Sequence, residues 1–82
     1  MEDSSSRYIV KPVDKALQVL HCVAEEGREL TLTEVSYKAR LPKTTTYRYL
    51  MTLRKWRLVA YDPKTDLYRL GPYLVVLAQR VG

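Results

Sequence analysis

The sequence predicts a mainly α-helical fold with a small β wing: a three-helix core, a two-stranded hairpin and a C-terminal helix. In three separate stretches, apolar residues recur at spacings of three and four, the pattern of helices that bury one face. Two short runs rich in β-forming residues, "LVAY" at 58–61 and "LYRL" at 67–70, flank the turn sequence "DPKTD". At 82 residues, the chain is long enough for one small domain.

A first helix is expected over residues 13–26, after a polar, Ser-rich arm of residues 1–10 that we expect to be flexible. Pro12 is tolerated at the helix start because the first N–H groups have no partner within the helix, and Gly27 can close the helix in the left-handed conformation. Its apolar stripe contains Val13, Ala16, Leu17, Leu20, Val23 and Ala24. Cys22 lies on the opposite side, which predicts either an exposed thiol or a subunit contact.

A short second helix is expected over residues 32–39. Thr31 and Glu34 have the spacing of a capping box, in which each side chain bonds the backbone N–H of the other residue. Pro42 prevents the helix from continuing and prepares a longer helix over residues 43–56. A short helix, a tight turn and a longer helix make a helix-turn-helix, and the hairpin adds a wing.

The third helix has two different faces at 100° per residue. One sector is expected to face inward: Thr46, Tyr49, Leu50 and Leu53. The opposite sector is expected to face outward: Thr44, Arg48, Met51 and Lys55, flanked by Tyr47 and Thr52. Trp56, near the end of this helix, is expected to pack into the core or against the wing.

Positive charge is concentrated in the middle of the chain. The formal net charge is +5, yet no Asp or Glu occurs from Val35 through Tyr61, where seven of the 14 basic residues lie. A helix that is only solvated usually mixes signs, because opposite charges four residues apart stabilise it. The pattern therefore favours a polyanionic partner such as nucleic acid, the alternative being a solvated face with a chance cluster of charge.

The start of the third helix carries hydroxyl groups where anions are favoured. Thr44 and Thr45 lie in the first turn, where N–H groups are unpaired and the helix dipole attracts negative charge. Their hydroxyls can bond phosphate oxygens or base edges in a major groove, and Tyr47 and Arg48 can reach the same surface one turn later. Taken singly, the threonines could equally be helix caps and Tyr47 a surface aromatic residue.

Cations also occur outside this helix. Lys64 at the hairpin tip and Arg69 on its second strand are candidate contacts to phosphates or the minor groove, although an exposed lysine in a turn needs no function. Arg7 and Lys11 in the N-terminal arm could follow a DNA backbone or groove in the same way.

Several other classes of protein are disfavoured. A single cysteine, Cys22, excludes an intrachain disulfide and favours the reducing cytoplasm. The N-terminus lacks the regions of a signal peptide, and the longest apolar run, "YLVVLA", is too short to span a membrane. His21 beside Cys22 is no zinc pattern, and there is no Gly-rich phosphate loop, carboxylate pair or catalytic triad, so we expect no metal, no cofactor and no enzyme.

The segments "GRELTLTEVSYKARLPKTTTYRYLMTLRKWRLV" and "YRLGPYLVVLA" resemble the N-terminal DNA-binding domain of IclR-type bacterial transcriptional regulators, over residues 12–81. The matching positions are Ala16 and Leu17, Leu30 to Glu34, Leu41 to Thr45, Arg48, Leu58 and Val59, and Tyr68 to Gly71. The resemblance implies a winged helix-turn-helix over residues 11–71 whose third helix enters the major groove of a double-stranded operator. By position, the groove-facing residues would be Lys43, Thr44, Thr45, Tyr47 and Arg48.

The resemblance also implies a homodimer or tetramer, and a C-terminal domain outside this chain that senses a small-molecule effector. Residues 72–82 would then form a linker and dimerisation helix. This segment is apolar on more than one face, and a small domain can bury only one of them, so we expect the other to pack against the same helix, or the first helix, of a second copy.

Three positions depart from the family pattern. Arg40 and Arg57 stand where the family commonly has Gly, so a positive φ at either position would carry a local cost of about 1 kcal/mol. Pro12 stands where a Ser often caps the first helix, which weakens that cap.

The expected function is sequence-specific binding of double-stranded DNA by a cytoplasmic transcriptional regulator, either repressor or activator. Lys55 is expected to contact DNA phosphates whatever the base sequence of the duplex. Two alternatives stay open: a winged helix whose basic face meets an acidic protein partner, and a basic amphipathic segment that lies on membranes. The hairpin and the capping box fit the membrane alternative badly.

Overall fold

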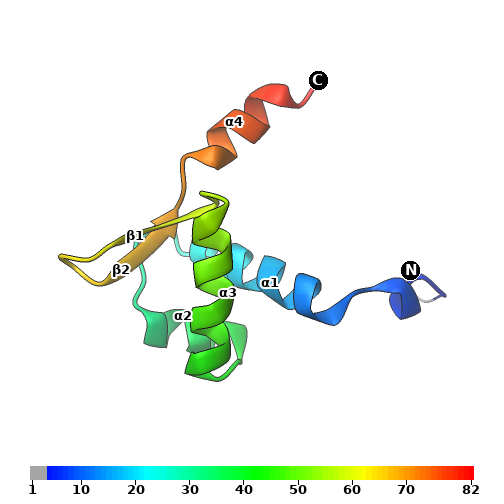
Figure 1. Ribbon diagram of the computed structural model, residues 1–82, viewed down its shortest axis with the longest axis horizontal. Helices are drawn as coiled ribbons and strands as arrows, with labels where there is room; N and C mark the ends of the chain where they lie inside the picture. Colours follow the sequence, from blue (N-terminus) through cyan, green and yellow to red (C-terminus); the bar gives the residue numbers. More distant parts are fainter. Residues whose placement is uncertain (1–3) are drawn as a thin grey trace.

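The structure, a computed structural model, describes residues 4–82 and consists of a three-helix core, a hairpin and a projecting C-terminal helix (Figure 1). Its elements are η1 (Ser4–Tyr8), α1 (Lys11–Glu25), α2 (Leu32–Ala39), α3 (Lys43–Lys55), β1 (Val59–Asp62), β2 (Leu67–Leu70) and α4 (Tyr73–Arg80). The predicted mainly helical winged helix-turn-helix is confirmed.

The core lies where the three helices meet the hairpin. Each element supplies one or two buried apolar side chains: Val19 and Val23 of α1, Leu30, Val35 of α2, Leu50 and Leu53 of α3, Val59 of β1 and Tyr68 of β2. Leu30 also pairs with Tyr68 through two backbone hydrogen bonds of 2.9 and 2.7 Å, so the loop after α1 extends the hairpin by one bridge. Burial of this apolar surface is the main stabilising term for a domain of this size.

The prediction of which α1 residues face the core is partly wrong. Val19 and Cys22 are buried, whereas Val13 and Leu17 are 57% and 54% exposed. Only the C-terminal half of α1 packs against the other elements, and its N-terminal half projects away from them (Figure 1). The periodicity within α1 could not reveal how far along its length the partners reach. Cys22 is only 8% exposed, so it is not the exposed thiol that one alternative predicted, and this burial raises the pKa of the thiol.

Helices α1, α2 and α3 end in the same way, with a residue in the left-handed conformation. The residues are Gly27 at φ 67°, Arg40 at φ 58° and Arg57 at φ 58°, so the expected strain at the two arginines is present. After α2 the N–H of Leu41 donates to the carbonyl of Ser36, and after α3 the N–H of Leu58 donates to Leu53. These bonds satisfy carbonyl groups that a helix end would otherwise leave unpaired.

Helix starts differ in how well they are capped. The predicted capping box of α2 is confirmed, with Thr31 Oγ1 accepting from the N–H of Glu34 at 3.1 Å and Glu34 Oε1 accepting from the N–H of Thr31 at 2.9 Å. In contrast, Val10 precedes α1 and supplies no side-chain cap, with Pro12 in the first turn. The start of α1 thus lacks a side-chain cap, but Pro12 does not stand at the cap position as expected, because the helix begins at Lys11 and the cap position is Val10.

The wing is an antiparallel hairpin in which Val59 pairs with Leu70 and Asp62 with Leu67. Beyond β2, Gly71 packs against the backbone of Arg57, whose carbonyl accepts the N–H of Tyr73 at 3.1 Å. This contact ties the first residue of α4 to the end of α3. No residue of α4 is buried.

Trp56 does not occupy the expected place in the core or against the wing, since it is 60% exposed. It directly follows α3, and the chain turns at Arg57, so that Leu58 bonds back to Leu53 and fills the next inward position. Trp56 is left outside this turn. In the N-terminal arm, Ser4–Tyr8 form one short 3-10 helix; residues 1–3 lie outside the described part, and the flexibility of the arm stays a prediction.

Candidate nucleic-acid interface

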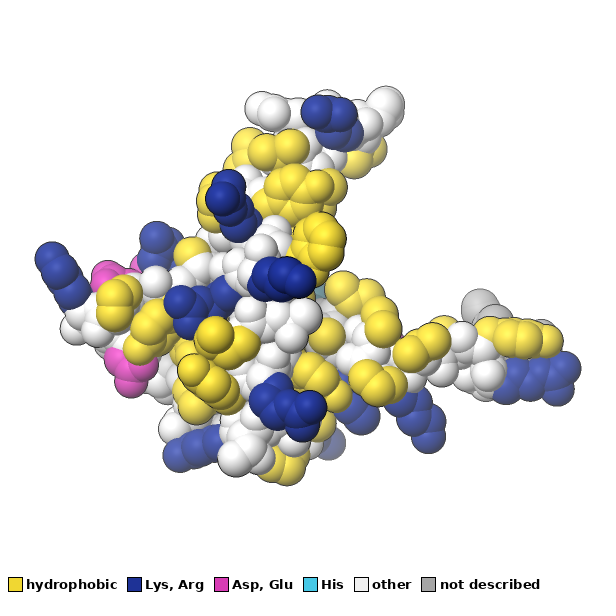
Figure 2. Space-filling model, viewed as in Figure 1, with side chains coloured by type: hydrophobic (Ala, Val, Ile, Leu, Met, Phe, Trp, Pro, Cys, Tyr) yellow, Lys and Arg dark blue, Asp and Glu magenta, His cyan; other side chains and the backbone are white. Residues whose placement is uncertain are grey.

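Helix α3 buries one face and exposes the other, as its sequence predicts. Thr46 and Leu50 are fully buried, and Leu53 is buried beside them. The opposite face is exposed along the whole helix: Thr44, Tyr47, Arg48, Met51, Thr52 and Lys55. In the view with α3 in front, Lys and Arg side chains are spread over the helix and the wing, while acidic side chains show only beside the wing (Figure 2). The exposed face of α3 is therefore a surface of one charge sign.

The N-terminal turn of α3 carries hydroxyl groups without using them as caps. Pro42 precedes the helix, no side chain caps it, and its first turn contains no acidic residue. The Thr46 hydroxyl donates to the Pro42 carbonyl at 3.0 Å inside the protein, whereas Thr44 is exposed and Thr45 half-buried. The alternative that Thr44 and Thr45 are caps is thus not what the structure shows. Lys43 and Thr44 stand at an exposed helix start whose dipole favours anions.

Ion pairs neutralise cations elsewhere on the domain. Glu26 pairs with Lys38, Glu34 with Arg28 at 3.2 Å, and Glu29 with Arg69 at 3.7 Å. These carboxylates lie at the end of α1, in the loop that follows and at the start of α2. Within residues 4–82, no ion pair involves the remaining cations of the acid-free stretch: Arg40, Lys43, Arg48, Arg54, Lys55 and Arg57.

The paired carboxylates are held in their charged form. The hydrogen bond from Lys38 lowers the pKa of Glu26, and the Thr31 N–H, assisted by Arg28, lowers the pKa of Glu34. Both groups are therefore ionised at neutral pH, so they keep their cations on the side of the domain that carries α1 and α2. The cations of α3 have no such partners to draw them away from a ligand.

Arg54 differs from the other cations of α3. It is half-buried, its Cζ lies 4.8 Å from the centroid of the Tyr61 ring, and its Nη1 lies 3.2 Å from Met51 Sδ. The sequence identified Arg54 only as one more positive charge. No spacing in the sequence predicts its contact, because Tyr61 lies on β1 and meets α3 only once the chain has turned.

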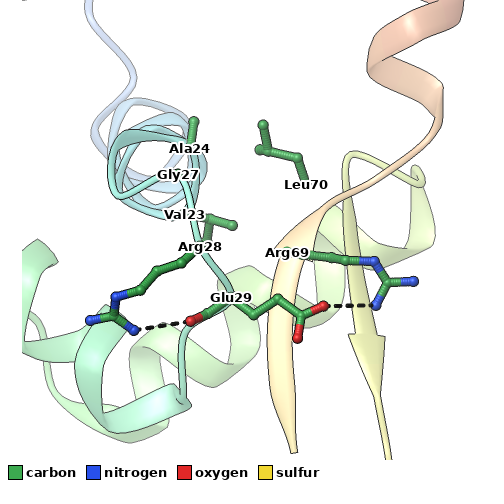
Figure 3. Close-up of a pocket in the computed structure, with 7 residues that line it drawn as sticks. All are labelled: Val23, Ala24, Gly27, Arg28, Glu29, Arg69 and Leu70. Atoms are coloured by element: carbon green, nitrogen blue, oxygen red, sulfur yellow. Dashed lines mark hydrogen bonds and ion pairs between the residues drawn. The ribbon is translucent and has the colours of Figure 1, made fainter.

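The two predicted cations of the hairpin end up in different surroundings. Lys64 is exposed at the tip, where its backbone N–H donates to Asp62 Oδ1 at 2.9 Å. Arg69 points instead toward Glu29, beside a pocket that Val23 and Leu70 also line (Figure 3). The structure brings Lys43, Thr44, Tyr47, Arg48 and Lys55 onto one helix face, with Thr45 at its edge, and leaves Arg69 in an ion pair beside the end of α1.

Other kinds of site find no support among residues 4–82. In this part of the chain, no three His, Cys, Asp or Glu side chains gather as a metal site would require. None of the described helices is long and apolar enough to pass through a bilayer.

Comparison with known families agrees with this geometry. The family model of the IclR helix-turn-helix domain matches residues 12–63, which extend from the start of α1 into the wing turn. The chain belongs to the IclR family. It carries the DNA-binding helix-turn-helix domain of IclR-family transcriptional regulators, and such a domain is not an enzyme.

Two curated relatives come from Escherichia coli K12. The chain is 36% identical over 67 residues to the HTH-type transcriptional regulator XynR, and 34% identical over 71 residues to the regulator KdgR. These alignments cover 82% and 87% of this chain but only 27% of each relative. The chain thus spans about a quarter of the length of the curated relatives it matches.

Solved structures show the same fold. An IclR transcriptional regulator from Alicyclobacillus acidocaldarius has a TM-score of 0.82 and 40% identity, over 89% of this chain and 30% of its own. An IclR-family regulator from Brucella abortus has a TM-score of 0.78 and 29% identity, over 96% of this chain and 29% of its own.

Proposed function

We propose that this IclR-family domain binds double-stranded DNA sequence-specifically, with α3 in the major groove and the wing on its flank. The observation that carries the proposal is the exposed face of α3, which bears hydroxyl, aromatic and basic side chains and no acid. A major groove is wide enough for a helix and offers base-edge donors and acceptors to such groups.

Roles follow from position along α3. Lys43, Thr44 and Thr45, at its N-terminal turn, would contact phosphates and the nearest base edges. Tyr47 and Arg48, one turn later, would read base edges, and an Arg that bonds guanine in two places is the commonest specific contact.

Further contacts would anchor the domain without reading sequence. Lys55 and Lys64 would bind phosphates at the far end of α3 and at the wing tip, and each contact releases counterions. Arg69 stays a weaker candidate, since binding a phosphate would compete with its ion pair to Glu29.

The domain would act as a homodimer or tetramer, through α4 and α1 of neighbouring copies. Support comes from apolar surface that nothing covers: Val75 of α4 is 61% exposed and Val13 of α1 is 57% exposed. A two-fold dimer would present two copies of α3 to successive major grooves, so the operator would be roughly palindromic. A small-molecule effector would act through a C-terminal domain outside this chain, in the cytoplasm.

Selection of bound sequences from a pool of random duplexes tests this function. We expect the selected duplexes to share a motif with two half-sites, and the affinity for them to fall steeply with salt. Titration of a selected and a scrambled duplex at low and moderate salt supplies the control. Equal affinity for both would refute sequence-specific binding, and no binding to either would favour the acidic-partner alternative.

A further inference from the structure

Tyr61 of β1 contacts both α3 and the domain core. The Arg54 guanidinium lies over its ring, with Cζ 4.8 Å from the ring centroid. The ring of Tyr68, its cross-strand partner, also has its centroid 4.8 Å away, with the two planes inclined at 43°. Tyr68 is 2% exposed and belongs to the core, so an unbroken series of contacts joins α3, the wing and the core.

Beyond Tyr61 the wing has no anchor in the core, because none of residues 62–67 is buried. The tip is instead bonded to itself: the N–H of Asp66 donates to the Asp62 carbonyl at 2.7 Å, and the N–H of Lys64 donates to Asp62 Oδ1 at 2.9 Å. The Tyr61 hydroxyl donates to Asp66 Oδ1 at 2.6 Å. The turn is therefore a small bonded unit, and the Tyr61 hydroxyl links it to the ring that contacts Arg54.

The contact with the Tyr61 ring favours an arginine guanidinium over a lysine ammonium of the same charge. A planar guanidinium stacks on an aromatic face, whereas a lysine ammonium is a compact, strongly hydrated charge. Arg54 is also half-buried, and its Nη1 donates to Met51 Sδ on the same helix at 3.2 Å, which restrains the head group that lies over Tyr61. Arg57, at the same end of α3, has the same charge but no ring contact among the described residues.

We propose that Arg54 and Tyr61 are positioning residues that set the angle of the wing against α3, so that Lys64 meets a phosphate while α3 occupies the groove. The inference rests on the proposed function. Lys64 lies in the turn that begins directly after β1, three residues beyond Tyr61, so a tilt of the wing at Tyr61 displaces Lys64 relative to α3.

The test uses Arg54→Lys, which keeps the net charge and removes the planar stack. Affinity of the 82-residue chain for a duplex selected from the random pool is measured across a series of salt concentrations. Each phosphate contact contributes about 0.9 to the slope of log affinity against log salt. We expect Arg54→Lys and Lys64→Ala each to lower this slope by about 0.9, and the double variant to lower it no further than either single variant.

Two further variants separate positioning from direct contact. Tyr61→Leu leaves Arg54 free, and we expect it to lower the slope as Arg54→Lys does. Arg57→Lys is the matched control, and we expect it to leave the slope unchanged. Thermal unfolding of each variant, followed by circular dichroism, shows that the measured chains are folded.

An unchanged slope in Arg54→Lys or in Tyr61→Leu, or additive losses in the double variant, would overturn the inference while leaving the proposed function intact. An unchanged slope in Lys64→Ala would also overturn it, and would remove Lys64 from the proposed phosphate contacts without affecting sequence-specific binding by α3. Failure of the unaltered chain to bind any duplex would instead contradict the proposed function itself. The two failures are therefore distinguishable.

Discussion

The Cα of Gly71 faces the backbone carbonyl of Arg57 so closely that a Cβ there would overlap the carbonyl oxygen. The hydrogen bonds around this contact join three elements: Gly71 N–H donates to Leu58 at 2.8 Å, and Tyr73 N–H donates to Arg57 at 3.1 Å. The end of α3, the end of β2 and the start of α4 thus meet at one glycine. No flexible side chain is there to move aside, so the position tolerates nothing larger.

Gly71→Ala should therefore destabilise the domain by about 1–3 kcal/mol, as overpacking against backbone does. Urea unfolding measures the loss. Gly82→Ala is the control, because no atom lies within 4 Å of the place its Cβ would take. Equal urea midpoints for Gly71→Ala and the unaltered chain would show that the backbone at Arg57 can move away from residue 71 without loss of stability.

Arg57→Gly and Arg40→Gly should stabilise the domain, each by about 1 kcal/mol, because both residues hold a left-handed conformation that glycine adopts without strain. The same helix ending already uses glycine at Gly27. Thermal unfolding measures the gain, with Arg48→Gly within α3 as the opposite control, where glycine costs about 1 kcal/mol. A lower melting temperature in Arg57→Gly would mean that its side chain stabilises the fold by more than the backbone strain costs.

Stability should fall with acid partly through Glu34. Its folded pKa lies below the ordinary value because the Thr31 N–H and Arg28 favour the carboxylate. A lowered folded pKa gives stability that is present above the unfolded pKa and is lost as the pH falls through the folded pKa. Glu34→Gln should thus be less stable than the parent chain at neutral pH, and the two should converge as the pH falls from neutral through the lowered folded pKa of Glu34. Urea unfolding across this pH range measures the difference, and a constant gap between the two chains would contradict the prediction.

The sequence was informative wherever one element contains its own determinants. The capping box at Thr31 and Glu34, the break at Pro42 and the two faces of α3 were all predicted, because each depends on residues within a few positions of one another. The buried side of α1, the exposure of Trp56 and the contact between Arg54 and Tyr61 were not. Each of these depends on where a partner element lies, and that position is set by the packing of the whole domain.

The same distinction applies to the candidate site. Its α3 residues could be identified from one helix's periodicity and charge, and Arg40 and Arg57 could be recognised as strained if their helices ended there. The prediction placed Arg69 correctly on the second strand, but its ion pair joins β2 to Glu29, forty residues earlier in the chain. Long-range pairing of this kind leaves no local pattern.

Arg48→Ala should weaken binding to a selected duplex by about 1–3 kcal/mol and relax the preference at one base position, as loss of a base contact does. Lys55→Ala should weaken binding to selected and scrambled duplexes alike, and lower the salt slope by about 0.9. Anisotropy titrations of both variants on both duplexes make the comparison. If Arg48→Ala weakened binding to the selected and the scrambled duplex equally, Arg48 would contact a phosphate and would not read a base.

The uncovered surface of α4 leads to the last prediction. None of its residues is buried, and Val75 and Val76 are 61% and 41% exposed, so their apolar surface is free for a second copy. Replacing both valines with Glu would place like charges at the centre of such a contact, and buried unpaired charge is strongly unfavourable. The double variant should sediment as a folded monomer with an unchanged melting transition at low concentration. Because Val75 and Val76 contribute nothing to the core of one copy, unchanged sedimentation would show that α4 is not the contact, and the exposed stripe of α1 would become the next surface to test.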